Sequence, residues 1–201
     1  MTALPDHDRP HILTIGHSTH SFDHFLALLR AAGVTAIADV RSAPYSRRAA
    51  QFNRETLAAS LRQAGLAYVH LGRELGGRPA DPTLYQNGVV DYERVAATPV
   101  FTGGVDRLIA GTRGHRIAVM CAERDPLQCH RCLLISRRLR ERDVAVSHIL
   151  ADGALLPHTA VETRLLAEAG LTAEDMFEAP ADRLARAYRA HAPRGPAALG
   201  P

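Results

Sequence analysis

The chain has 201 residues, of which 46% are hydrophobic and 22% are charged, and these values are typical of one soluble globular domain. No stretch approaches the ~20 continuous apolar residues of a membrane helix. The opening residues MTALPDHDRP lack the basic and apolar regions of a signal peptide. We therefore expect a cytoplasmic protein that makes no membrane contact.

All 24 basic residues are arginines, because the sequence contains no lysine, and the net charge is +3. This composition excludes Schiff-base lysines, pyridoxal-phosphate anchors and lysine-dependent phosphate loops. Recognition of phosphate or carboxylate groups is left to guanidinium groups, which bind these anions in a planar, bidentate manner.

Short apolar runs bounded by polar residues or glycine predict five buried strands. They are His11–Ile15, Thr35–Val40, Ala67–Leu71, Arg116–Cys121 and Val144–Leu150.

Helical patterns separate these runs. The segments 22–32 and 54–64 each end just before a glycine, Gly33 and Gly65, as helices commonly do. Alternating strands and helices predict a three-layer α/β fold, in which a mainly parallel sheet has helices on both faces.

Further helix starts are indicated near the C-terminal end. Thr159 with Glu162 fits a capping box, and Thr172 before Glu174 and Asp175 predicts another start.

We expect one domain over residues 11–191, in which residues 159–191 form a helical appendage. Residues 1–10 and 192–201, rich in proline, glycine or alanine, are expected to be mobile. Segment 72–91 has no clean period and predicts either a binding loop or a tolerated surface insertion.

Polar side chains lie in the last residues of the predicted strands or follow them; Tyr68 and His70 are carried by the third strand itself. Because ligands of parallel sheets bind beyond the carboxyl ends of the strands, these side chains are the candidate site. They are His17, Ser18, Asp39, Arg41, Ser46, Tyr68, His70, Arg73, Glu74, Cys121 and Glu123.

The segment after the fourth strand also carries Cys129, His130 and Arg131. Asp125 and Pro126 fit the N-cap and first position of a helix, which predicts Cys129 and His130 in or just beyond its first turn. Backbone N–H groups there would favour an anion and lower the pKa of a thiol.

Three interpretations of the cysteines stay open. Cys121 or Cys129 is a nucleophile with a histidine as its base, or Cys121, Cys129 and His130 bind a metal, although usual zinc spacing is missing. In the third, the cysteines are structural; Cys132 fits this reading because it shares a helix face with core residues. The cysteine count and spacing argue against disulfides.

Several known motifs are absent. The position that carries arginine in a phosphatase loop counted from Cys121 is Leu127, and the nucleophile-elbow and dinucleotide patterns are missing. The basic run 136–142 lies in a predicted helix, where arginines also suit the dipole and the solvent. Nucleic acid is therefore a less favoured partner than a small anion.

Four ordered segments, TIGHS, ADVRSAPYSRRAAQF, YVHLGRELGG and CAERDPLQCHR, together resemble the DUF488 family from about His11 to Asp152. The resemblance implies a single α/β domain and no particular reaction. Its characteristic positions are Gly16, His17, Ser18, Asp39, Arg41, Pro44, Ser46, Phe52, His70, Leu71, Gly72, Glu74, Cys121, Glu123, Cys129, His130 and Arg131. Cys132 lies outside this pattern.

These observations predict a small enzyme of the hydrolase or transferase type that acts on an anionic, phosphate- or nucleotide-containing ligand. The expected catalytic groups are Cys121, Cys129, His130, Asp39, Glu74 and Glu123. The expected ligand-binding groups are His17, Ser18, Arg41, Ser46, Tyr68, His70, Arg73 and Arg131. The alternatives are a nucleotide- or nucleic-acid-binding module and a metal protein; cofactor and oligomeric state stay open.

Overall fold

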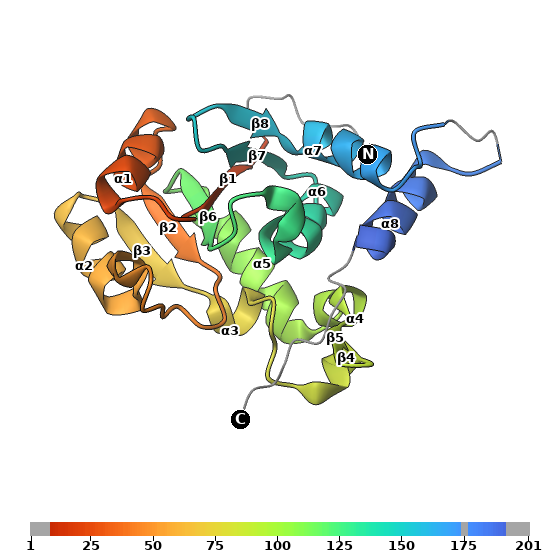
Figure 1. Cartoon of the computed structure of the whole chain (residues 1–201), viewed down its shortest axis with the longest axis horizontal. Coiled ribbons are helices and arrows are strands. Elements are labelled where there is room, and N and C mark those ends of the chain that lie inside the picture. The colour runs from red at the N-terminus through yellow and green to blue at the C-terminus, as the bar shows by residue number, and fades with distance from the viewer. Residues whose placement is uncertain (1–8, 174–176, 192–201) are drawn as a thin grey trace.

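A computed structural model describes residues 9–173 and 177–191 and contains a six-stranded sheet in the order β3-β2-β6-β1-β7-β8 (Figure 1). The first five of these strands are parallel, and β8 is antiparallel to β7. The strands are β1 (His11–Gly16), β2 (Ala36–Asp39), β3 (Ala67–His70), β6 (Ile117–Cys121), β7 (Ala145–Ile149) and β8 (Leu155–Pro157). The predicted mainly parallel sheet is confirmed.

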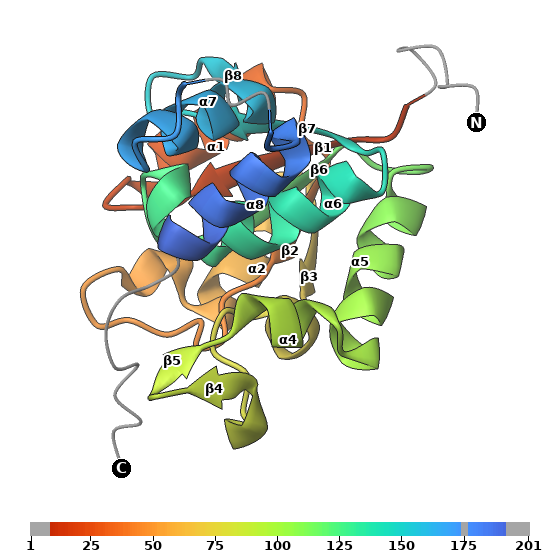
Figure 2. The same ribbon diagram turned by 90° about the vertical axis from the view of Figure 1, so that its right-hand side faces the viewer.

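Helices cover both faces of the sheet (Figure 2). The helices α1 (Phe22–Ala31) and α2 (Arg54–Gln63) pack on one face, while α5 (Pro99–Gly111) and α6 (Arg137–Glu141) pack on the other. Within the described ranges, no helix is long and apolar enough to span a bilayer.

Neighbouring residues of one strand serve different cores. Ile12 of β1 packs with the α5 and α6 side, whereas Leu13 packs with Phe25 of α1, and both are fully buried. Burying a side chain of this size contributes roughly 1.5–3 kcal/mol. Burial on both faces explains why β1, β2 and β6 appear as continuous apolar runs in the sequence. The prediction of a buried strand at Ala67–Leu71 is wrong for β3, whose residues are exposed or half-buried because the strand lies at the edge of the sheet.

The predicted ends of α1 and α2 agree with the structure to within a residue. Ser21 caps α1 by accepting a hydrogen bond from the His24 backbone N–H, and Gly33 and Gly65 follow the two helices with φ of +67° and +81°. A side chain at either glycine would strain the backbone, because L-residues rarely adopt positive φ.

Segment 72–91 has more local structure than its sequence indicates. It contains α3 (Gly72–Leu75), the 3₁₀ turn η2 (Pro82–Leu84) and the hairpin of β4 (Tyr85–Gln86) and β5 (Val89–Val90), and it leads into α4 (Tyr92–Ala96). The turn at Asn87 and Gly88, both with positive φ, closes the hairpin.

The helix predicted from Asp125 is interrupted. Asp125 does cap a turn, but that turn is the three-residue 3₁₀ helix η3 (Pro126–Gln128), and Cys129 then has extended backbone (φ −139°, ψ 138°). A π-helical segment η4 (Arg131–Ser136) follows, in which Ser136 Oγ donates to the Arg131 carbonyl at 2.7 Å. Cys129 therefore lies between two helical segments rather than in a first turn. A further 3₁₀ turn, η1 (Ala50–Phe52), lies before α2.

The predicted C-terminal helices are present as α7 (His158–Glu168) and α8 (Pro180–His191). The capping box expected at Thr159 is wrong, because α7 already begins at His158 after Pro157. Residues 174–176, which include the acidic pair expected after Thr172, lie outside the described residues. Of the two termini predicted to be mobile, 1–10 and 192–201, only residues 9 and 10 are described.

A buried chain of hydrogen bonds joins this appendage to the sheet. Thr14 Oγ1 lies 2.7 Å from His148 Nδ1, and His148 Nε2 lies 2.9 Å from His158 Nδ1. His158 Nε2 lies 2.9 Å from the Tyr188 hydroxyl, which donates to Glu162 at 3.2 Å. If each group donates to the next, every imidazole nitrogen has a partner while both rings are neutral.

The buried row of hydrogen bonds predicts that the protein loses stability in acid. Burial, and then the charge of its histidine neighbour, holds the pKa of His148 well below 6.5, and burial lowers the pKa of His158 to about 4. Below pH 6.5 the unfolded chain takes up protons that the folded protein resists. The free energy of unfolding should therefore fall as the pH drops from about 6.5 towards 4, by ~1.4 kcal/mol per pH unit for each proton.

Urea unfolding at a series of pH values measures this slope. His158→Gln should unfold more easily at pH 7 but show a shallower pH dependence, because it removes one of the titrating rings. An identical slope in the variant and the parent would contradict this origin.

Candidate functional site

The carboxyl ends of β1 and β6 meet at a topological switch point. The two strands are neighbours, but β1 leads to α1 on one face and β6 leads to η4 and α6 on the other. The His17 backbone N–H donates to the Cys121 carbonyl at 2.9 Å, and the Val40 N–H donates to Met120 at 3.1 Å. Open α/β sheets bind ligands at such a position.

Two thiols, a carboxylate and an imidazole converge there, and we call Cys121, Glu123, Cys129 and His130 the cysteine cluster. Glu123 Oε2 lies 3.0 Å from Cys121 Sγ and 3.1 Å from Cys129 Sγ. His130 Nδ1 lies 3.7 Å and 4.0 Å from the same two sulfurs. Cys121 and Cys129 are only 4% and 2% exposed, whereas Glu123 is exposed.

The orientation of the His130 ring is fixed by two backbone segments. Its Nε2 donates to the Val40 carbonyl at 3.1 Å, so Nδ1 is the nitrogen that faces the sulfurs. Gly77 lies against the ring, and a Cβ at this position would stand 2.6 Å from His130 Cγ. Position 77 therefore has room only for glycine while the ring holds this place.

The two thiols have opposite pKa shifts. Burial raises the pKa of Cys129, but the hydrogen bond from Cys121 and the positive charges of Arg131 and His130 outweigh it and hold this pKa well below the ordinary range. The hydrogen bond to Cys129, together with burial, raises the pKa of Cys121. Of the two thiols, Cys129 therefore loses its proton more readily.

Arg131 positions the loop that carries Glu123. Its guanidinium donates to the carbonyls of Glu123 and Arg124 at 2.5 and 3.0 Å, and the side chain is 1% exposed. The loop crosses directly over Gly16, where a Cβ would stand 1.9 Å from the Glu123 carbonyl oxygen. Two Arg131 nitrogens are thus engaged with backbone, which leaves little of this group for the anion expected from the sequence.

A second group of predicted residues surrounds Asp39. Arg41 donates to both carboxylate oxygens, through Nε at 2.9 Å and Nη2 at 2.6 Å, and the Tyr68 hydroxyl donates to Oδ2 at 2.9 Å. Arg41 Nη2 also donates to the Phe52 carbonyl at 2.8 Å. Asp39 and Arg41 are 0% and 7% exposed, so they form a buried ion pair.

His17 completes this group. Its Nδ1 donates to the Ser18 carbonyl at 2.9 Å, its Nε2 accepts from Arg41 Nη1 at 3.2 Å, and its ring stacks on Phe52 at 4.3 Å between centroids. Burial and the nearby Arg41 charge lower the pKa of His17 to about 4. The ring is therefore neutral at pH 7 and serves as an acceptor for Arg41.

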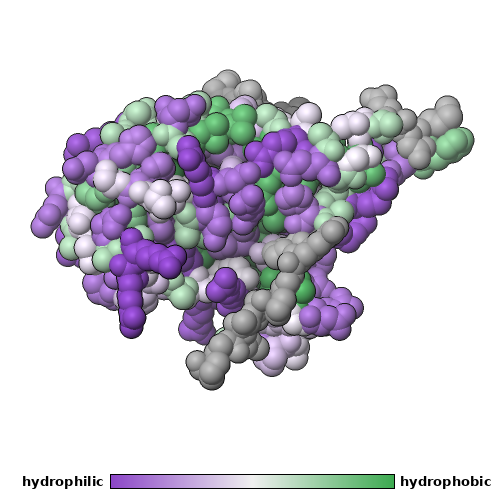
Figure 3. Space-filling view, in the orientation of Figure 1, coloured by the Kyte–Doolittle hydropathy of each residue, from purple (hydrophilic) through white to green (hydrophobic). Residues whose placement is uncertain are grey.

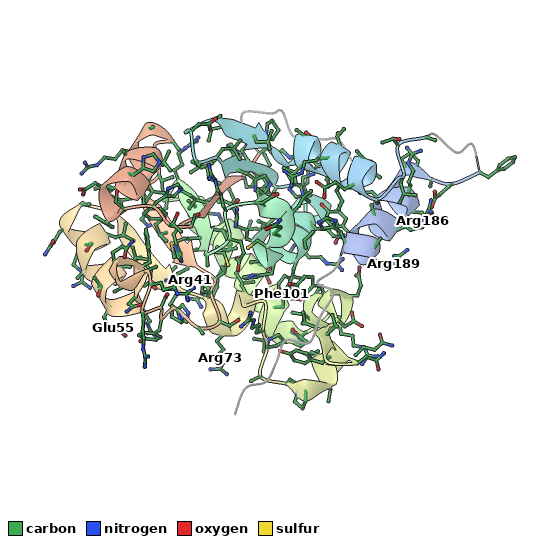
Figure 4. All side chains as sticks on the ribbon, in the orientation of Figure 1. Arg41, Glu55, Arg73, Phe101, Arg186 and Arg189 are labelled. Atoms are coloured by element: carbon green, nitrogen blue, oxygen red, sulfur yellow. The ribbon has the colours of Figure 1, made fainter. Side chains whose placement is uncertain are left out.

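The remaining predicted residues are more scattered. His70 Nε2 donates to the Arg41 carbonyl at 2.9 Å, and Ser46 Oγ accepts from a loop N–H. Arg73 extends from α3 away from the ribbon, whereas Arg41 lies inside it (Figure 4). Glu74 pairs with Arg107 of α5 at 2.7 Å and so is not brought into the cysteine cluster.

Tyr92 lies near the cluster but carries no recognisable functional signal in the sequence. Burial raises the pKa of Tyr92, the negative charges of Cys129, Cys121 and Glu123 raise it further, and Arg78 opposes them. Tyr92 begins α4 after the N-cap Asp91, so only the helix start was readable. A hollow of about 190 Å³ beside α8 includes Tyr92 but no cluster residue.

The buried ion pair leads to a prediction about stability. Asp39→Asn would leave the Arg41 guanidinium buried without its counter-charge, and such a loss costs about 3–5 kcal/mol. Tyr68→Phe removes one hydrogen bond to the same carboxylate and should cost about 1 kcal/mol. Urea unfolding of both variants measures the difference, and equal losses would contradict the structural role of the pair.

Comparison with known proteins gives one match. The family described as domain of unknown function DUF488 matches residues 21–137, which is more than half of the 201-residue chain. The matched segment includes the cysteine cluster and Asp39, while the TIGHS segment precedes it. No curated protein and no solved structure shows significant similarity. The chain belongs to the DUF488 family.

Proposed function

We propose that Cys121, Cys129 and His130 bind a zinc-like divalent metal ion and that the protein is a metal-dependent hydrolase acting on an anionic substrate. One observation carries this proposal: one ligand atom from each of the three residues lies within 4.8 Å of the other two. Two thiolates and an imidazole form the donor set of known catalytic zinc sites.

The surroundings of the three ligands support a metal. The His130 Nε2–H bond to Val40 is the outer contact that metal-binding histidines usually make, because it fixes the tautomer and the ring orientation. The Arg131 backbone N–H points to Cys129 Sγ at 3.5 Å, which suits an anionic sulfur.

The charges of the cluster also favour a cation. The two buried sulfurs, of Cys121 and Cys129, each lie within 3.1 Å of the same carboxylate oxygen of Glu123. All three atoms can carry negative charge. Groups this close repel one another unless protons or a cation lie between them. A metal ion would displace those protons and be held by the same atoms.

Cys121, Cys129 and His130 would hold the metal with three protein ligands, the number typical of catalytic rather than structural zinc sites. Such a metal would polarise a substrate oxygen and acidify water. Glu123 is exposed and its carboxylate lies beside both sulfurs. We assign it the role of accepting the proton from the attacking water.

The proposal differs from the nucleophilic cysteine favoured by the sequence. Both thiols are nearly inaccessible, and Arg41 and Arg131 are engaged with Asp39 and with backbone carbonyls. A buried thiol is a poor nucleophile for an external substrate, but burial is compatible with metal ligation; a substrate would reach such a metal from the side of the exposed Glu123.

Cys132, His148 and His158 also bring ligand atoms within 4.8 Å. Their imidazole nitrogens are already occupied by Thr14, by each other and by Tyr188. This second group is therefore better described as a hydrogen-bonded network.

Metal analysis of the purified protein tests the site directly. We expect about one zinc per chain, lost in Cys121→Ser, Cys129→Ser and His130→Asn but kept in Cys132→Ser, which is the matched cysteine control. Circular dichroism establishes that each variant is folded. Loss of metal in Cys132→Ser alone, or a folded parent protein that binds no added zinc, would refute the assignment.

The role of Glu123 has a separate test. Glu123→Gln should keep the metal but lower kcat on a chromogenic phosphodiester, bis(p-nitrophenyl) phosphate, by about 10²- to 10⁴-fold, because proton transfer contributes this much. Chelation should abolish the parent activity, and added zinc should restore it. Activity that survives chelation and is lost on alkylation would instead identify a nucleophilic thiol.

A further inference from the structure

Exposed arginines gather on the loops that leave the strands beside the cysteine cluster. We call them the rim arginines: Arg47 and Arg48 after β2, Arg73 and Arg78 after β3, and Arg124 after β6. In Figure 3, strongly hydrophilic side chains project over this part of the surface. Among the described residues, none of the five makes an ion pair within 4.0 Å.

Arginines on the helices of the opposite face behave differently. Seven of them are paired with a carboxylate at 3.7 Å or less; they are Arg94, Arg107, Arg137, Arg138, Arg140, Arg142 and Arg164. Among the described residues, Arg54, Arg113, Arg116 and Arg189 are also exposed without a carboxylate within 4.0 Å. The rim arginines therefore differ from the others by their place on three loops at the sheet end that holds the cysteine cluster. Arg30 and Arg62 are exposed and have no carboxylate within 4.0 Å among the described residues, but they lie in the last turns of α1 and α2, where a cation offsets the helix dipole.

Carboxylates of the same loops do not neutralise the rim arginines. Asp39 is bound to Arg41, Glu74 to Arg107 and Asp125 to Arg164. Glu55 accepts from the Tyr45 hydroxyl at 2.7 Å, Asp81 accepts from Thr83, and Glu123 belongs to the cluster. The five rim arginines outnumber these three carboxylates, so the rim is a surface of net positive charge distributed over three loops, which suits several linked phosphates better than one small anion.

An exposed aromatic ring lies within the same surface. Tyr45 precedes Arg47 and Arg48 by only a few residues and is 60% exposed, while its hydroxyl is held by Glu55. Proteins that bind single-stranded nucleic acid combine a positive surface with aromatic rings on which unpaired bases stack. A base inside a duplex is not available for such stacking.

Resting on the proposed function, we infer that the substrate of the site is a single-stranded nucleic acid. Its phosphates contact the rim arginines and one base stacks on Tyr45, so that a phosphodiester lies at the cysteine cluster. The anionic ligand predicted from the sequence is then a polymer, and the residues that bind it are the rim arginines rather than Arg41 and Arg131.

Fluorescence anisotropy with labelled dT12 and U12, on zinc-loaded protein, tests this inference. Binding should weaken linearly with log[salt], and Arg47→Glu/Arg48→Glu and Arg73→Glu/Arg78→Glu should each weaken it at least tenfold. Each neutralised phosphate contact should also lower the slope by about 0.7. Tyr45→Ala should weaken binding about tenfold, while Tyr45→Phe, which keeps the ring, should bind like the parent.

The matched control is Arg30→Glu/Arg62→Glu, which changes the net charge equally away from the rim and should leave binding unchanged. An equal loss in this control, equal affinity for the duplex, or binding of mononucleotide alone would overturn the inference. Metal content is measured in the same samples. If the zinc-loaded protein binds no oligonucleotide, the inference about the substrate is overturned and the proposed hydrolase is not. If the protein takes up no zinc but binds oligonucleotide through the rim arginines, the proposed hydrolase is overturned and the binding surface stands.

Discussion

The contact between Gly16 and the loop over it determines the geometry of the candidate site. Arg131 donates to the carbonyls of Glu123 and Arg124, and the loop can lie this close because residue 16 has no side chain. The loop fixes Glu123 beside Cys121, and Cys129 and His130 directly precede Arg131 in the chain. One buried guanidinium therefore links the loop after β6 to the segment that carries Cys129 and His130.

Two buried arginines thus act within the protein, while exposed arginines are left to contact a ligand. Arg41 neutralises Asp39 and orients His17, and Arg131 organises backbone. In a chain without lysine, the planar fork of arginine supplies these bonds, since it satisfies several acceptors at once. The division follows burial: a buried guanidinium must be paired inside the fold, whereas one on the rim stays hydrated until a ligand arrives.

The metal proposal depends on the break between η3 and η4. In a continuous helix from Pro126, the side chains of Cys129 and His130 would point about 100° apart around the helix axis. Extended backbone at Cys129 instead directs its sulfur back to the end of β6. This break is invisible to spacing rules, which explains why the pattern Cys-x7-Cys-His does not resemble a usual zinc sequence.

The sequence by itself determined the parallel sheet and the ends of α1 and α2, because hydrophobic runs, Ser21, Gly33 and Gly65 act over a few residues. It also indicated which polar residues follow the strands. Only the tertiary structure decided that Glu74 pairs with Arg107 outside the cluster and that Tyr92 lies near it. These outcomes depend on contacts between residues distant along the chain, which local periodicity does not encode.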